Sequence, residues 1–209
     1  MALFDGISCR DFPCGDVNHA AYRMPKVDLD PTKVRIVLIS EAAPEDPADD
    51  YYADGATQSA SLFEQTTVLA FQDAGAQVSS LQEILDLGVY MTTAVKCAKT
   101  NYTMKAATIN ACSELLAQEL AHFPNVEAYL LMGDAAIKAV NAIARRDGDG
   151  RIIPAGSTYK IRGEAVTWRG ARVFPSYLQA GPAFFIEKGK RAMIAEDIRE
   201  ALRVAGLTP

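Results

Sequence analysis

Apolar and polar positions alternate along the 209-residue chain in a way that predicts strands followed by helices. Short β-branched or apolar runs, typical of buried parallel strands, lie at residues 34–39, 89–95 and 127–132. Stretches with apolar residues three or four apart follow them, at residues 61–71, 105–123 and 135–146. This order predicts right-handed crossovers and a parallel sheet with helices on both faces.

The pattern changes after residue 150, where three short segments with Gly-containing turns are typical of strands, at residues 158–161, 165–168 and 172–174. A helix over residues 188–204 closes the pattern, with Gly206 as its stop signal. We therefore expect a single α/β domain over residues 1–209. Its predicted architecture is a three-layer α/β/α sandwich around a mostly parallel four-stranded sheet.

Composition and charge narrow the possible partners. The net charge is −5, but residues 1–95 hold 5 Lys and Arg against 15 Asp and Glu, whereas residues 96–209 hold 16 against 11. The overall negative charge argues against non-specific binding along nucleic acids. The basic residues of the second half can form a phosphate-binding face, or they can be scattered, solvated surface charges. No apolar run reaches the roughly 20 residues of a membrane helix, and the start lacks a signal-peptide pattern, so we expect a cytoplasmic protein.

In open parallel sheets, ligands bind beyond the carboxyl ends of the strands. Three loops follow predicted strands, at residues 40–55, 96–104 and 133–134, and the loop at residues 175–182 can join them. The first contains five carboxylates, which predict either a hard-cation site or a solvated loop, at Glu45, Asp46, Asp49, Asp50 and Asp54. Past the next strand, Lys96, Lys99 and Lys105 are candidates for a phosphate contact or for surface solubility.

The four cysteines are the candidate metal ligands. Cys9 and Cys14 lie in a loop-like stretch, Cys97 closes a strand, and Cys112 lies on the apolar stripe of the next helix. Reduced thiols that cluster in this way accept zinc or an iron–sulfur cluster, and the alternative is four small buried apolar residues. His19 could replace one ligand, whereas His122 near a helix end is typical of a capping or surface group.

Four motifs, in order, resemble those of the uracil-DNA glycosylase superfamily, most nearly its iron–sulfur family 4 branch. Residues 39–45, Ile-Ser-Glu-Ala-Ala-Pro-Glu, stand where the family has a strand and Gly-Glu-Ala-Pro-Gly. Residues 92–97, Thr-Thr-Ala-Val-Lys-Cys, are similar to the family's Thr-Asn-Val-Val-Lys-Cys. Residues 129–136 resemble its strand, Gly and Ala-Ala turn, and residues 175–180, Pro-Ser-Tyr-Leu-Gln-Ala, resemble its Pro-Thr-Tyr-His-Pro-Ser. The resemblance runs from about Cys9 to the last helix.

The chain departs from these motifs at functional positions. Leu178 stands in place of the family's histidine, Gln179 in place of the following proline, and Thr93 in place of the base-reading asparagine. Ser40 replaces the first Gly, and four residues separate Cys9 from Cys14 where the family usually has two. The motifs therefore predict the scaffold more strongly than the activity.

The resemblance implies hydrolysis of an N-glycosidic bond to a base in DNA. Glu41 would position the water and stabilise the sugar cation, unless it is only a loop carboxylate or helix cap. A hydroxyl of Thr93, Ser176 or Tyr177, or backbone N–H groups, would replace the histidine as donor to the departing base. Tyr51 and Tyr52 are candidates to sandwich the extruded base, whereas Phe63 has a core pattern. The predicted substrate contacts are Ser40, Ala42, Tyr51, Tyr52, Thr93, Lys96, Ser176, Tyr177, Leu178 and Gln179.

The predicted function is thus a divergent DNA glycosylase that removes uracil or another modified base. The resemblance implies that Cys9, Cys14, Cys97 and Cys112 hold a structural 4Fe–4S cluster, with zinc as the alternative. It also implies a DNA partner, single-stranded or a duplex with a flipped base, and a monomer. Two other functions stay open: a non-catalytic nucleic-acid or damaged-base binding module, and a small-molecule hydrolase acting on nucleosides.

Overall fold

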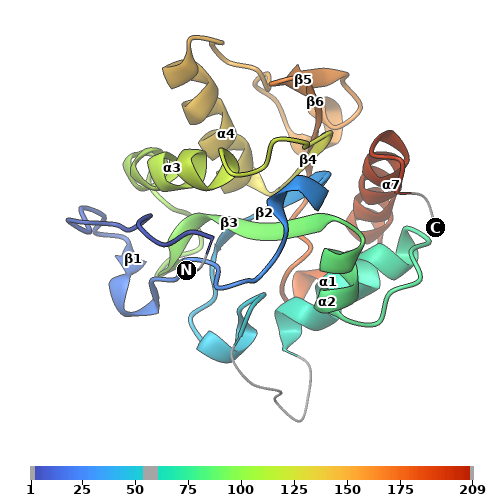
Figure 1. Cartoon of the computed structure of the whole chain (residues 1–209), viewed down its shortest axis with the longest axis horizontal. Coiled ribbons are helices and arrows are strands. Elements are labelled where there is room, and N and C mark those ends of the chain that lie inside the picture. The colour runs from blue at the N-terminus through green and yellow to red at the C-terminus, as the bar shows by residue number, and fades with distance from the viewer. Residues whose placement is uncertain (1–2, 54–60, 208–209) are drawn as a thin grey trace.

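A mixed sheet of six strands forms the centre of the computed structural model, which describes residues 3–53 and 61–207 (Figure 1). Its order is β1-β3-β2-β4-β6-β5. The strands are β1 (Val17–Asn18), β2 (Ile36–Ala43), β3 (Val89–Lys99), β4 (Ala128–Met132), β5 (Val166–Trp168) and β6 (Ala171–Ser176). The four inner strands are parallel, and β1 and β5 pair antiparallel with their neighbours. The expected four-stranded sheet is therefore its parallel centre, extended by a short antiparallel strand at each side.

Helices cover both faces of the sheet, as the sequence pattern predicts. They are α1 (Leu62–Asp73), α2 (Leu81–Asp86), α3 (Ala106–Leu120), α4 (Asp134–Asp147), α5 (Thr158–Ile161), α6 (Ala183–Ile186) and α7 (Lys188–Val204). Figure 1 shows α3 and α4 on one side and α1, α2 and α7 on the other. Each side has its own buried apolar cluster, because residues of β2 alternate between them: Val37 and Ile39 face α3 and α4, whereas Ile36 and Leu38 face α1 and α7.

One predicted strand is wrong. Residues Thr158–Ile161 form the short helix α5 instead. The Ser157 carbonyl accepts hydrogen bonds from the amides of Lys160 and Ile161, at 2.9 and 3.2 Å. Ile161 is buried while Tyr159 is exposed, so a helical turn satisfies the local backbone and buries the one apolar side chain.

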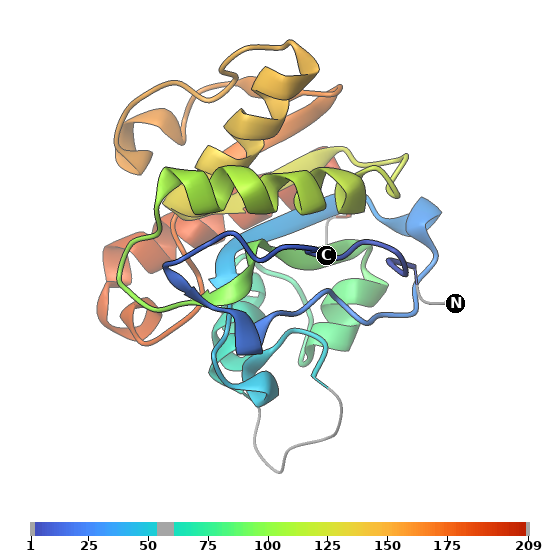
Figure 2. The same cartoon turned by 90° about the vertical axis from the view of Figure 1, so that its left-hand side faces the viewer.

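The N-terminal segment is held against β3 and α3 (Figure 2). Residues of β1 pair with Lys99 and Ala98 at the end of β3. Asp16 is buried, and its carboxylate accepts a hydrogen bond of 2.6 Å from the Lys105 amide and another from the Thr108 hydroxyl, at the start of α3. These contacts bring the two N-terminal cysteines towards the strand and helix that carry the other two.

Short 3-10 turns complete the described elements, at His19–Ala21, Pro31–Lys33 and Pro47–Asp49. Two residues of the predicted acidic loop, Asp54 and Gly55, lie outside the described residues. In the described part of the chain, no helix has the length and apolarity needed to cross a bilayer.

Candidate functional site

Glu41 lies near the carboxyl end of β2, as the sequence predicts. Its Oε2 atom is 3.1 Å from the Lys99 Nζ atom, and its side chain is 19% exposed. On its other side, Glu41 packs against Gly133, the residue that precedes α4, so closely that a Cβ there would lie 2.7 Å from Oε1. The carboxylate is thus held between an ammonium group and the start of a helix.

Ser40, the preceding residue, points into a different environment. It is fully buried, and its hydroxyl contacts the Tyr51 hydroxyl. The Gln179 amide donates to both, at 2.6 Å to Tyr51 and 3.2 Å to Ser40, and lies 3.4 Å from the Thr67 hydroxyl. Burial raises the pKa of Tyr51 to about 12. This polar cluster fixes the last motif to β2 and to α1, and it occupies the hydrogen-bonding groups of three predicted substrate contacts.

Thr93 and Tyr52 line a small hollow at the ends of β2 and β3, together with Tyr51, Ala43, Arg23 and Asp50. Tyr52 stacks on Tyr90, with ring centroids 6.0 Å apart, and its hydroxyl accepts a hydrogen bond of 3.1 Å from the Met91 amide. The hollow adjoins a cavity of about 660 Å³ that shares Arg23, Asp50 and Tyr52 with it. The hollow itself is only about 10 Å³, so a flat ligand such as a base would lie in the adjoining cavity, against Tyr52 and Arg23.

A partly buried arginine marks the boundary of this hollow. The Arg23 side chain is 28% exposed, but its Nε atom is buried and has no hydrogen-bond partner among the described residues, and Asp50 Oδ2 is 4.0 Å away. Burial raises the pKa of Asp50, against the lowering effects of the Tyr52 amide and of Arg23. Arg23 therefore retains donor capacity at the wall that it shares with Thr93.

The last motif does not present all its side chains to one surface. Ser176 is fully buried, and its hydroxyl donates to Asp197 Oδ2 at 2.6 Å. Arg162 also contacts Asp197, at 2.8 Å, and burial raises the pKa of that carboxyl. Leu178 is half-buried, so the position of the family's histidine carries an apolar side chain. Tyr177 is half-buried too, and the Lys190 Nζ atom lies 5.5 Å from the centre of its ring.

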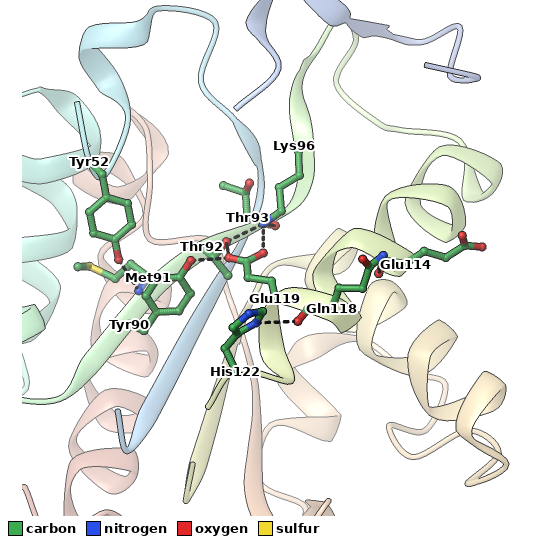
Figure 3. Close-up of polar contacts among 10 residues, drawn as sticks. All are labelled: Tyr52, Tyr90, Met91, Thr92, Thr93, Lys96, Glu114, Gln118, Glu119 and His122. Carbon is green, nitrogen blue, oxygen red and sulfur yellow. Dashed lines mark hydrogen bonds and ion pairs between the residues drawn. The ribbon is translucent and has the colours of Figure 1, made fainter. Parts of the chain in front are cut away.

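Lys96 is enclosed by the protein, as Figure 3 shows. Its Nζ atom is 2.5 Å from Glu119 Oε2, and both side chains are fully buried. It also donates to the Thr92 hydroxyl and to the Thr93 carbonyl, at 2.7 and 2.8 Å. Lys99 and Lys105, by contrast, reach the surface. Of the three candidate lysines, only these two are open to a phosphate, while Ala42, another predicted contact, is buried in the sheet.

The four cysteines converge on one region. All four belong to or pack against the apolar cluster beneath α3, and three of them line a cavity of about 450 Å³. Burial, together with the proximity of Cys112, Cys9 and Cys14, raises the pKa of Cys97 to about 12. All four thiols are free. Among the described residues, however, no three His, Cys, Asp or Glu side chains stand close enough to form a ready metal site. Four thiols are a donor set that suits either zinc or an iron–sulfur cluster.

Three carboxylates of the acidic loop have local hydrogen-bond partners. Asp46 accepts from the Ala48 amide at 2.9 Å, Asp50 from the Tyr52 amide at 3.0 Å, and Asp49 from the Leu62 amide at the start of α1, at 3.2 Å. Side chains that cap turns and a helix in this way are not arranged as a cation site. His19 is exposed and packs on Phe12, with ring centroids 5.1 Å apart, and the His122 ring contacts the Gln118 carbonyl at 3.0 Å.

Sequence reasoning missed two buried carboxylates that position these groups, Glu119 and Asp197. Each lies on the apolar stripe of its helix, beside Leu120 in α3 and Ile198 in α7. A carboxylate among the apolar residues of a buried helix face requires a polar or charged partner inside the protein. Its position in the apolar pattern was therefore the sequence signal for a buried polar contact.

Comparison with known proteins supports the resemblance. No curated protein matches the chain. The family model described as "Uracil DNA glycosylase superfamily" matches residues 27–196, which include β2, β3, β4, β6 and most of α7. The chain therefore belongs to the uracil DNA glycosylase superfamily.

Proposed function

We propose that this protein is a divergent DNA glycosylase that hydrolyses the N-glycosidic bond of uracil or another modified base. The observation that carries the proposal is the position of Glu41, at a strand's carboxyl end between Lys99 and Gly133. In the proposed reaction, a water oxygen bonds to the sugar C1′ as the bond from C1′ to the base nitrogen breaks. The bonding electron pair leaves with the base, and Glu41 orients the water and accepts its proton.

The departing base needs a donor, because Leu178 has none. Ser176 already donates to Asp197, and the Gln179 amide is engaged by Tyr51 and Ser40. We assign the role to the hydroxyl of Thr93, a residue that lines the hollow beside Tyr52. The loss of one strong donor typically costs a factor of roughly 10² to 10³ in rate, so we expect a slow enzyme.

The direct test compares Glu41→Gln with Glu45→Gln on a panel of oligonucleotides that carry uracil or other modified bases. Glu41→Gln should lower base release at least ~100-fold, because the amide cannot accept the proton. Glu45 is exposed and four residues away, so its variant controls for charge. Equal base release by Glu41→Gln and the unmodified protein would refute the assignment.

A DNA partner with unpaired bases is the finer part of the proposal. Tyr102 is 93% exposed, and the Lys99 Nζ atom is 5.8 Å from the centre of its ring. Tyr177 and Lys190 form a similar pair at 5.5 Å, and Lys190 lies near enough to Tyr102 to interact electrostatically. Exposed aromatic rings beside lysines are typical of surfaces on which unpaired bases stack while phosphates meet the cations. We therefore propose single-stranded DNA, or a flipped base and its neighbours, as the ligand.

We propose further that Cys9, Cys14, Cys97 and Cys112 hold a structural iron–sulfur cluster, which would ally the chain with the family 4 branch. The four-thiol donor set and the convergence of the cysteines support this; zinc would suit the same donors. When bound, the group would cross-link the N-terminal segment to β3 and α3. Anaerobic purification with iron, sulfide and zinc analysis tests it: stoichiometric iron and sulfide support a cluster, stoichiometric zinc replaces it, and neither metal refutes the site.

The alternative of a non-catalytic binding module is favoured by one observation, the apolar Leu178 where the family has histidine. Salt-dependent DNA binding without release of any base from the panel would choose this alternative. A nucleoside hydrolase would instead turn over free nucleosides without affinity for DNA.

A further inference from the structure

The strand β3 contains a bulge between the two predicted sites. Ala42 of β2 pairs with Val95, but the next residue, Ala43, pairs with Ala98. Lys96 and Cys97 are therefore the two extra residues of β3. A bulge interrupts the alternation of side chains along a strand and re-aims those of the extra residues. The Lys96 side chain nevertheless lies on the same face of β3 as Tyr90 and Thr92, because all three contact Glu119 of α3.

The Lys96 ammonium holds this bulge from inside. It contacts Glu119 of α3 at 2.5 Å and donates to the Thr92 hydroxyl and the Thr93 carbonyl (Figure 3). The other carboxylate oxygen of Glu119 accepts from the hydroxyls of Tyr90 and Thr92, at 2.5 and 2.6 Å. The Oε2 atom of Glu119 is close to the Lys96 ammonium but is not aligned to accept a hydrogen bond from it. The attraction between the two side chains is therefore mainly that of opposite charges.

A buried ion pair is an unexpected means of stabilising a core. Removing two charges from water is costly, and well-packed uncharged residues are often equally or more stable. The pair makes a contact that such residues could not make, the hydrogen bond to the Thr93 carbonyl. The Lys96 carbonyl also accepts a hydrogen bond of 2.7 Å from the Arg23 amide, and Arg23 lines the hollow together with Thr93.

We propose that the Lys96–Glu119 pair positions Thr93 and Arg23 in the hollow beside the predicted base-binding cavity, and that it couples this hollow to the thiol region. The coupling is covalent and short: Cys97 follows Lys96, and Cys112 lies two turns before Glu119 on α3. Lys96 and Glu119 are positioning residues that touch no substrate. The proposal rests on the proposed function where base release is the readout.

The test uses the double variant Lys96→Met/Glu119→Gln. Met keeps the apolar stem of Lys96, and the Gln carbonyl still accepts from Tyr90 and Thr92, so no buried charge is left alone. We expect a folded protein whose kcat for base release falls at least 10-fold while KM for the oligonucleotide changes less than threefold. Arg35→Met/Glu127→Gln is the matched control, because it removes an ion pair near the amino end of β2 and should leave kcat unchanged.

A second readout, hydrogen exchange, does not depend on catalysis. In the Lys96→Met/Glu119→Gln variant, the Arg23 amide and the amides of residues 93–97 should exchange at least 10-fold faster, with the β4 amides unchanged. Wild-type kcat together with wild-type exchange in this variant would overturn the positioning role. Absence of base release from the unmodified protein would count against the glycosylase proposal only, and the exchange result would then decide whether the pair holds the bulge.

Discussion

The side chain of Glu41 fills the space that any side chain on Gly133 would need. A Cβ atom at Gly133 would lie 2.7 Å from Oε1 and 2.8 Å from Cγ of Glu41. Gly133 also has a φ of +105°, a conformation that L-residues with side chains rarely adopt. The first residue after β4 is thus a glycine for two reasons, the close approach of the Glu41 carboxylate and the conformation of its own backbone.

Gly133→Ala should therefore displace Glu41. We expect base release to fall at least ~10-fold, because the carboxylate loses its place beside the sugar. Stability should fall by about 1–3 kcal/mol from backbone strain. Gly148→Ala is the control, since Gly148 has a φ of +91° with open space around it. That variant should lose comparable stability and keep its base release; an equal loss of release in both would remove Glu41 from the explanation.

Tyr51→Phe should flatten the dependence of stability on alkaline pH. Burial raises the pKa of Tyr51 to about 12, whereas an unfolded chain releases the same proton near pH 10. The unfolded state therefore binds fewer protons above pH 10, and stability falls as pH rises from about 10 to about 12, by about 3 kcal/mol. Denaturant unfolding of both proteins at several pH values between 8 and 12 measures the difference. Parallel pH profiles would contradict the burial of this hydroxyl.

Tyr102→Ala should weaken binding to single-stranded oligonucleotides. Loss of one stacked base typically costs about 1–3 kcal/mol, which is about 5- to 150-fold in Kd. The slope of affinity against salt should stay the same, because no phosphate contact is lost. Tyr159→Ala is the matched control, because Tyr159 is also exposed but lies on α5, outside the proposed DNA-binding surface. Fluorescence anisotropy would decide, and similar Kd values for the two variants would exclude Tyr102 as a stacking residue.

Asp16→Ala should loosen the N-terminal segment. The carboxylate accepts from the Lys105 amide and the Thr108 hydroxyl, and loss of such a cap costs about 1 kcal/mol. Cys9 should then be alkylated faster in the metal-free protein, because its stretch is less firmly held. Asp30→Ala removes a comparable cap at Thr32, away from the cysteines, and should leave alkylation of Cys9 unchanged. Equal rates in both variants would show that Asp16 does not anchor this segment.

Much of the fold follows from local sequence pattern. The helix predicted at residues 188–204 has the bounds of α7, because its apolar stripe is long and Gly206 ends it. The apolar stripe of α3 is buried as expected. The strand predicted at residues 158–161 is wrong because four residues show too little periodicity to distinguish a strand from one turn of helix. The two-residue strand β1 had no pattern at all, and it depends on pairing with Lys99 and Ala98.

The candidate site was less predictable, because its contacts join distant segments. Sequence placed Glu41 and Thr93 at neighbouring strand ends, where the structure has them. It could not pair Gln179 with Tyr51, since 128 residues separate them. Nor could it pair Lys96 with Glu119, because the two residues lie on different elements and meet only where α3 packs on β3.

The stacked tyrosine at residue 52 also has a consequence for solubility. Its hydroxyl accepts the hydrogen bond of the Met91 amide. The Lys96 carbonyl accepts that of the Arg23 amide, and β1 pairs with the end of β3. Positions at which a foreign strand could add to β3 are thereby already used. A protein with an eleven-residue, almost wholly buried strand beside so short an outer neighbour would otherwise be prone to self-association through its backbone.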